Sequence, residues 1–443
     1  MPDTSHEHGL RHQLSAGQMA MVAVGGSIGT GLLLGSAAAL QIAGAGVILS
    51  FLLAALINWT VTLAMGELAS RHPAAGAFGL YGDLYLNPWA GFISRAGYWA
   101  AICISIGAEM IAAATYLAFW FPAVPGLVWV VLFSLLLLLV NLWSVGHYGR
   151  FEYWFAMIKL ATIAAFVVIG GALLLARRVP AQYTAHGGFL PNGALAPLLA
   201  MGFAVYTFGG VEMVAITSGE SRSQSEIPRA VRLTFLILTS VYVGAIIVLA
   251  GIMPWNRAGV TESPFVSVFR HVGIPSASHV MNFVVLTAAL SGSNAALYVG
   301  SRMLFSLART GWAPAAFGKL NSVGSPRRAL IVSSFGILLA LVLEKWSPQD
   351  AFVSIISAAL VGMLLSWLVT LAAHVKFRRQ LPPEELPHLP GRSPLGAVGS
   401  ILGFGLVLVA ILESGRLVLV SGLVYMIVLT AAYFLLKSRQ RRT

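Results

Sequence analysis

The chain has 443 residues, of which 58% are hydrophobic and 9% are charged. A soluble domain carries roughly 25% charged residues, and a soluble fold could not bury this much apolar surface. The composition therefore indicates an integral membrane protein. The single cysteine, Cys103, excludes a disulfide framework and a cysteine metal site within one chain. The ten histidines are scattered, mostly in tails and loops, so we expect no metal site.

Long stretches without Asp, Glu, Lys or Arg set the positions of the predicted helices. A spanning helix needs roughly 20 apolar residues, and the charge-free stretches 12–66 and 110–149 are each long enough for two. Gly44-Ala45-Gly46 divides the first stretch, and 122–126, with two prolines, divides the second. We predict an all-α polytopic membrane protein of about twelve transmembrane helices, with the spans 17–40, 45–67, 94–120, 126–145, 153–176, 195–218, 231–253, 277–306, 328–344, 351–375, 396–413 and 416–436.

The net charge of +12 would suit a nucleic-acid-binding protein, but its distribution favours a membrane orientation. If the N-terminus is inside, Lys159 lies within a span and only six of the other basic residues lie outside. This bias predicts a multi-pass protein of the cell membrane with both termini cytoplasmic. The C-terminal basic residues would then lie beside anionic lipid, and we expect no nucleic-acid partner. The six outer residues are Arg177, Arg178, Arg257, Arg270, Lys345 and Arg416.

One membrane domain, 15–437, is predicted between a polar tail, 1–14, and a basic tail, 438–443. A weak internal repeat divides it: Gly25 and Gly209 are 184 positions apart, and Glu109 and Asn294 are 185 apart. We therefore predict two halves of opposite topology with glycine-interrupted helices at matching places, a pattern typical of a midplane binding site. The halves are about 15–176 and 195–375, and helices eleven and twelve follow at about 396–436.

The first predicted helix carries four glycines within 25–31. Each costs a helix roughly 1 kcal/mol relative to alanine. Close packing against another helix is one explanation, since Gly25 and Gly29 have small-xxx-small spacing. We favour an unwound break, in which freed N–H groups and a helix terminus face an anion such as a substrate carboxylate.

Short motifs follow this stretch in a fixed order. They are Gly25–Gly35 (GGSIGTGLLLG), Gly66-Glu67, 73–78 (PAAGAF), 88–92 (PWAGF), 119–122 (FWFP), Gly219-Glu220, 227–230 (IPRA), 263–265 (SPF) and 301–304 (SRML). In this order they resemble the amino-acid–polyamine–organocation superfamily, and more narrowly the bacterial amino acid transporter family, which includes aromatic amino acid, lysine and 4-aminobutyrate permeases. Residues 41–46 and the 221–226 loop depart from the family pattern. These departures weaken any assignment of a particular family member's substrate to this chain.

The resemblance implies a leucine-transporter-type fold with an inverted 5+5 repeat, in which broken helices one and six hold the substrate. It implies that the substrate carboxylate lies at the first break and the amino group near backbone carbonyls of the sixth. Ser291 and Asn294 would add hydrogen-bonding groups from the eighth helix, unless they only bond between helices. The matching first- and sixth-helix positions are Ser27, Ile28, Gly29, Thr30, Gly31, Phe203, Tyr206, Thr207, Phe208, Gly209 and Gly210.

Three charged residues lie inside the predicted spans and are candidates for proton coupling. Glu109 is a carboxylate in mid-span, which must be paired or protonated there. Lys159 lies near one end of the fifth span, so its side chain could instead snorkel to the surface; in some relatives a lysine here replaces a sodium ion. Glu212 follows the sixth-helix break and could orient it or join a proton path.

These features together predict a secondary active transporter that carries amino acids, for which we favour proton symport. An amino acid exchanger remains an alternative that the sequence does not distinguish from a symporter. A channel is less favoured, because it would favour polar or charged rings along a continuous pore rather than two broken helices. A membrane enzyme is disfavoured because no nucleophile-elbow, metal-ligand or Walker motif is present. We expect no cofactor beyond the coupling proton. The expected partners are an amino acid substrate and the lipid bilayer. Phe203, Tyr206 and Phe208 would suit a neutral or aromatic substrate, although aromatic residues equally often only pack.

Overall fold

The computed structural model describes residues 14–73, 77–143, 148–321 and 326–440. Most of the two predicted tails, and residues 74–76 of the 73–78 motif, lie outside this part of the chain. Within it the chain forms helices and no strand, and its β-type contact is an isolated bridge between Leu14 and Ser221.

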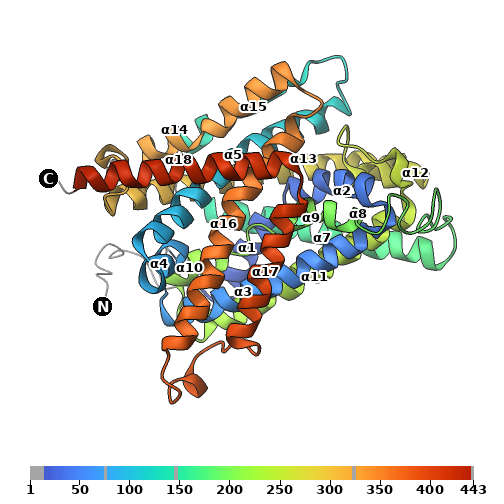
Figure 1. Cartoon of the computed structure of the whole chain (residues 1–443). Helices are drawn as coiled ribbons and strands as arrows, with labels where there is room; N and C mark the ends of the chain where they lie inside the picture. Colours follow the sequence, from blue (N-terminus) through green and yellow to red (C-terminus); the bar gives the residue numbers. More distant parts are fainter. Residues whose placement is uncertain (1–13, 74–76, 144–147, 322–325, 441–443) are drawn as a thin grey trace.

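The first half of the chain combines long helices with a few shorter helical pieces (Figure 1). Two predicted turns are present: Gly44 has φ +60° between two helices, and α5 and α6 are separated at 119–125. The elements are α1 Ala16–Ser27, η2 Gly31–Gly35, α2 Ser36–Ala43, η3 Gly44–Gly46, α3 Val47–Arg71, α4 Ala77–Tyr85, α5 Pro88–Ala118, α6 Gly126–Trp143 and α7 Tyr148–Leu175.

The second half contains more short pieces. The predicted spans at 195–218 and 328–344 are each divided into shorter helices. The elements are α8 Ala196–Leu199, α9 Met201–Thr207, α10 Met213–Thr217, η4 Ser218–Glu220, α11 Glu226–Ile252, η5 Trp255–Arg257, α12 Pro264–His271, α13 Pro275–Arg309, η6 Ala315–Gly318, α14 Arg327–Ser333, α15 Phe335–Trp346, α16 Ala351–Gln380, η7 Leu386–His388, α17 Gly396–Glu413 and α18 Arg416–Gln440.

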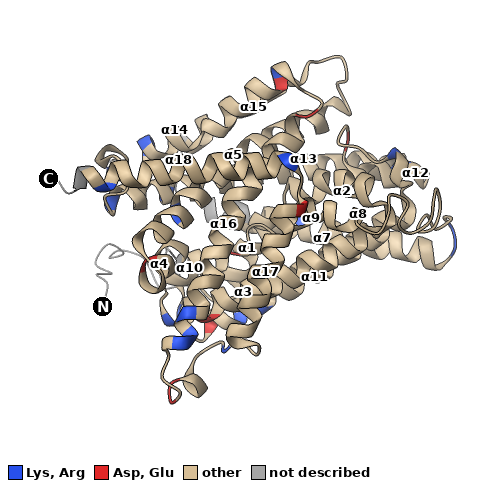
Figure 2. Ribbon diagram, viewed as in Figure 1, with Lys and Arg blue, Asp and Glu red and all other residues tan. Residues whose placement is uncertain are grey.

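In the described residues, nine helical stretches are long and apolar enough to cross a membrane. The predicted all-α, multi-pass membrane architecture is therefore confirmed. The count of about twelve spans and the inverted repeat stay predictions, because several predicted spans are short or interrupted and one stretch, Gly31–Arg71, covers most of two. Figure 2 shows that charged residues gather at the ends of the helices and leave the middle of the bundle almost uncharged.

Helix α5 forms the centre of the bundle. It packs against α4, α6, α13, α15 and α16, and 83% of its most apolar window is buried. Helix α18 lies at the periphery, with only 11% of its window buried, and its exposed side chains are largely Leu, Val and Ile. An apolar exterior of this kind suits contact with lipid. The residues that could meet a polar ligand must therefore lie on the central helices.

Both glycine-rich segments interrupt their helices, as the sequence predicts. Helix α1 ends at Ser27, Ile28 leaves the helical region at φ −77° and ψ 88°, and the chain resumes as a π-helix at Gly31. In the sixth predicted helix, α9 ends at Thr207 and α10 begins at Met213, with Gly210 at φ +102° between them. A side chain would be strained at that φ, which explains glycine at this position.

Candidate functional site

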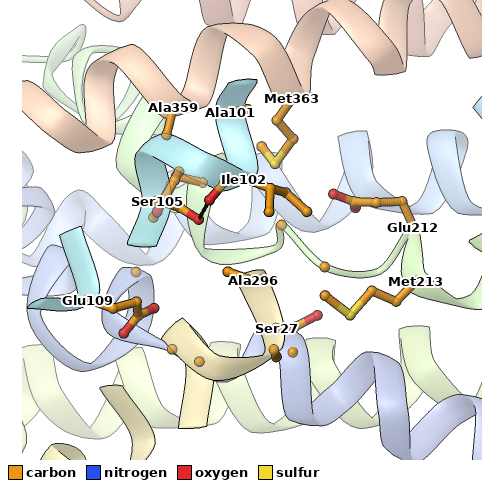
Figure 3. Close-up of a pocket in the computed structure, with 18 of the residues that line it drawn as sticks. Ser27, Ala101, Ile102, Ser105, Glu109, Glu212, Met213, Ala296, Ala359 and Met363 are labelled. Carbon is orange, nitrogen blue, oxygen red and sulfur yellow. Dashed lines mark hydrogen bonds between the residues drawn. The ribbon is translucent and has the colours of Figure 1, made fainter. Parts of the chain in front are cut away.

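A cavity of about 90 Å³ lies between the two interrupted helices. Its walls come from the end of α1, the first break, the 206–213 segment, α5, α13 and α16 (Figure 3). Helix termini and irregular backbone are tolerated at membrane depth only where they line a cavity or are buried in protein. The two breaks and the cavity therefore form one structural unit.

Helix α5 supplies one face of the cavity. This face follows the helical repeat, with Tyr98, the adjacent pair Ala101 and Ile102, then Ser105 and Glu109, so these residues lie on one side of the helix. The Ser105 hydroxyl donates to the Ile102 carbonyl at 2.7 Å, so the donor of this serine is used within its own helix (Figure 3). Glu109 consequently supplies the strongest polar group on this face.

The Glu109 carboxylate fits into a slot that two glycines leave open. Its Oε1 accepts the backbone N–H of Thr30 at 3.3 Å, at the first break. An ideal Cβ would lie 2.7 Å from this oxygen at Gly29 and 3.1 Å from it at Gly292. Within the described residues Oε2 has no hydrogen-bond partner, although Glu109 is only 8% exposed. A buried carboxylate oxygen without a donor can take up a proton or an ammonium group.

Lys159 contacts the end of α1 just before the same break. Its side chain is 2% exposed, and Nζ donates to the Gly25 carbonyl at 3.0 Å. Gly25 lies in the last turn of α1, where backbone carbonyls lack partners within the helix and a cation is favourable. The side chain therefore does not snorkel to the surface in this structure. Helix α7, which carries Lys159, packs against both α1 and α13.

Glu212 lies just after the sixth-helix break and is 1% exposed. The side chains of Tyr98 on α5 and Trp367 on α16 lie against its carboxylate. Glu212 therefore connects the break to two central helices. This arrangement fits the orienting role that the sequence left open, and the cavity wall also includes Glu212.

The structure brings about half of the predicted site residues to the cavity wall. These are Ser27, Gly29, Gly31, Tyr206, Gly209 and Gly210, together with Glu109 and Glu212. Others lie beside it: Thr30 contacts Glu109 through its N–H, and the Thr207 Cα would lie 3.0 Å from a Cβ added at the wall residue Gly31.

Several predicted residues do not line the cavity. Ile28 is fully buried in the apolar core, and Phe208 packs edge-on against Tyr242 with ring centroids 5.1 Å apart. Asn294 accepts a hydrogen bond from Asn141 on α6 at 2.6 Å, which fits the alternative of interhelical bonding. Ser291 and Phe203 are also absent from the wall.

Sequence reasoning missed the apolar part of the wall. Helical spacing from Glu109 could have identified the α5 residues, because they share its face. No comparable signal marked the residues from α13 and α16, since small apolar residues are common throughout these helices. The missed residues are Gly26, Tyr98, Ala101, Ile102, Ser105, Met213, Gly292, Ala295, Ala296, Ala359 and Met363. Among the described residues, no group of three or more His, Cys, Asp or Glu could hold a metal ion.

Comparison with known proteins identifies the family. A family model described as amino acid permease matches residues 18–436. The chain belongs to the amino acid permease family. Its activity is accordingly the transport of amino acids across a membrane, and the resemblance seen in the short motifs is confirmed.

Individual relatives of this amino acid permease are similar over most of their length. An uncharacterized amino acid permease of Bacillus subtilis, YtnA, is 34% identical over 96% of this chain and 95% of its own. The gamma-aminobutyric acid permease of B. subtilis is 36% identical, over 86% and 83%. The aromatic amino acid transport protein AroP of Escherichia coli is 34% identical, over 86% and 84%. These names cover different substrates at similar identity, so similarity alone does not choose among them.

Proposed function

We propose that this permease imports amino acids across the cytoplasmic membrane by proton symport, and that the cavity between the two breaks holds the substrate. The observation that carries the proposal is the position of Glu109: a buried carboxylate with one oxygen on the first break and the other without a donor in the described residues. The inside-positive charge pattern supports cytoplasmic termini.

The first break offers backbone N–H groups to an anion. The Thr30 N–H already donates to Glu109 Oε1. A substrate carboxylate that approaches the same donors meets the charge of Glu109, and two carboxylates in one site repel strongly unless one binds a proton. Protonation of Glu109 therefore favours substrate binding, which links the two events.

Lys159 would act on the end of α1 just before the same break. As an ammonium it stabilises the carbonyl end of α1 through Gly25. Loss of its proton would remove that charge and weaken the hold on α1. A proton can shift a conformational equilibrium only if its affinity differs between the two states. The coupling role therefore requires the Lys159 side chain to change its surroundings when α1 moves.

Reconstituted vesicles with imposed gradients test the proposal. We expect uptake of at least one of the twenty amino acids or 4-aminobutyrate, driven by an inward proton gradient and independent of sodium. Strict sodium dependence would overturn proton symport. Uptake only in exchange for internal amino acid would instead support the antiporter alternative.

Substitution of Lys159 makes the same experiment sharper. Lys159→Ala should lose accumulation, and Lys159→Arg should bind substrate but turn over poorly, because arginine does not deprotonate in proteins. Proton-driven accumulation by Lys159→Arg at the rate of the unmodified protein would remove Lys159 from the mechanism.

A further inference from the structure

Two methionines lie against the glycines of the two breaks. A Cβ added at Gly26, in the last turn of α1, would collide with the sulfur of Met213. A Cβ added at Gly209, in the second break, would lie 2.8 Å from the sulfur of Met363. Each thioether thus fills the space that a side chain would otherwise take. Both methionines line the cavity, one from α10 and one from α16 (Figure 3).

Apart from the Glu212 carboxylate, the cavity wall near these methionines is largely apolar. Ala101 and Ile102 come from α5, and Ala296 and Ala359 come from α13 and α16. Glu109 faces the first break, whereas Glu212, which directly precedes Met213, lies on the side of the methionines and against Tyr98 and Trp367 (Figure 3). A ligand whose charged end meets Glu109 and the first break would therefore direct its other end toward apolar groups.

The two thioethers form part of the wall of this cavity of about 90 Å³, so their conformation sets part of the room that a substrate side chain has. Methionine is unbranched, polarizable and adaptable. The other apolar residues near it are alanines and glycines, which have no rotatable side chain, and the branched Ile102.

We propose that Met213 and Met363 determine which side chains this permease accepts, as movable walls that select apolar amino acids. The proposal rests on the proposed substrate site. Rotation of either thioether away from its glycine would change the space available without disturbing the backbone. Because the moving groups are apolar, an uncharged side chain gains contact with them, whereas an ammonium or guanidinium loses its water against the thioethers and gains only if it reaches the Glu212 carboxylate.

The test is a binding competition with purified protein, using alanine, leucine, phenylalanine, tryptophan and lysine as probes. The first test variant is Met363→Ala, and Met213→Ala is an independent second variant. One methylene in a hydrophobic pocket discriminates by about 10–200-fold. We therefore expect each Met→Ala variant to raise the ratio of the affinity for free tryptophan to the affinity for free alanine by at least about tenfold.

Two controls separate selectivity from damage. Leucine roughly conserves the volume of methionine, so Met363→Leu should change the ratio much less than Met363→Ala. Met303→Ala, which removes a methionine from α13 away from the cavity wall, should leave it unchanged. Size-exclusion chromatography of each variant shows whether it remains folded.

Three outcomes would overturn the proposal. Unchanged ratios, or an equal loss of affinity for all five probes, would mean that the methionines only pack. Preference of the unmodified protein for lysine would mean that the two carboxylates, not the thioethers, select the side chain. If the unmodified protein transports amino acids and the ratios do not move, only this inference fails. If it binds and transports none, the proposed function fails with it.

Discussion

Two buried carboxylates in the central helices have opposite surroundings. Glu67, near the end of α3, is fully buried and surrounded by donors: Arg378 at 2.6 and 2.8 Å, His374 at 3.2 Å and the Ser393 N–H at 2.8 Å. Glu109, on α5, has the Thr30 N–H on one oxygen and no donor in the described residues on the other.

The difference distinguishes a carboxylate with a structural role from one that can bind a proton or a ligand. A buried charge is costly unless it is paired and hydrogen-bonded. At Glu67 one oxygen accepts hydrogen bonds from Arg378 and the Ser393 N–H, and the other forms an ion pair with Arg378 at 2.6 Å. These partners join α3, α16 and the loop that precedes α17. At Glu109 the condition is only half met, so a proton or a ligand can complete it. The same residue type thus holds helices together in one place and can respond to ligand in the other.

The largest effect is expected at Glu67. Glu67→Ala should lower the free energy of unfolding by about 3–5 kcal/mol, because removal of one partner leaves a buried, uncompensated charge. Thermal unfolding in detergent, followed by tryptophan fluorescence, measures the loss as a lower Tm. Replacement of Arg378 by alanine should have an effect of similar size, since it breaks the same pair.

An exposed ion pair on the same side of the protein provides the control. Arg71 and Glu385 pair at 2.9 Å with about half of each side chain exposed. Pairs of this kind contribute about 0–1 kcal/mol, so Glu385→Ala should barely move the Tm. Equal shifts for Glu67→Ala and Glu385→Ala would refute the structural role of Glu67.

A second substitution tests the other carboxylate. Glu109→Gln should leave the Tm nearly unchanged, because glutamine keeps the shape and can still accept from Thr30. It should abolish proton-driven accumulation, because the titratable proton is lost. Vesicle uptake between pH 5.5 and 8 measures this, with counterflow of substrate to show whether binding survives. Accumulation at the unmodified rate across this range would make Glu109 as structural as Glu67.

A smaller effect is expected from the slot that holds Glu109. Gly29→Ala places a Cβ 2.7 Å from Glu109 Oε1, so the carboxylate must shift away from the first break. We expect substrate affinity to fall by about tenfold, equivalent to about 1.4 kcal/mol, in equilibrium binding. Gly17→Ala is the matched control, since a Cβ there meets nothing within 4 Å. Equal affinities for both variants would show that the slot does not contribute to binding.

The contrast between the carboxylates also shows what the sequence could and could not predict. Charge-free stretches revealed the helices, and glycine clusters revealed both breaks, because these signals are local. Glu67 entered the sequence analysis only as part of a motif, since its partners are more than 300 positions away. The apolar wall residues of α13 and α16 were missed for the same reason: no local sequence pattern distinguishes their alanines and methionine from the other apolar residues of these helices.

The smallest effect is expected at His72, five residues after Glu67. His72 Nε2 and the Tyr85 hydroxyl are 2.6 Å apart, and the Tyr85 ring packs edge-on against Phe377 of α16. Burial, and secondarily the charge of Arg71, lower the pKa of His72 below its usual value of about 6.5. The unfolded chain therefore binds this proton more readily than the folded protein does, and stability must decrease as pH falls below about 6.5.

Replacement of His72 shows how far the stable region around Glu67 depends on pH. The unmodified protein should have a lower Tm at pH 5.5 than at pH 7.5, and His72→Gln should reduce this difference, because glutamine can still bond to Tyr85 but does not titrate. His388→Gln, at an exposed position, is the matched control. If His72→Gln keeps the full pH dependence, the acid sensitivity belongs to other groups. A reduced dependence would show that a single half-buried histidine makes the end of α3 acid-sensitive beside a carboxylate whose partners hold it fixed.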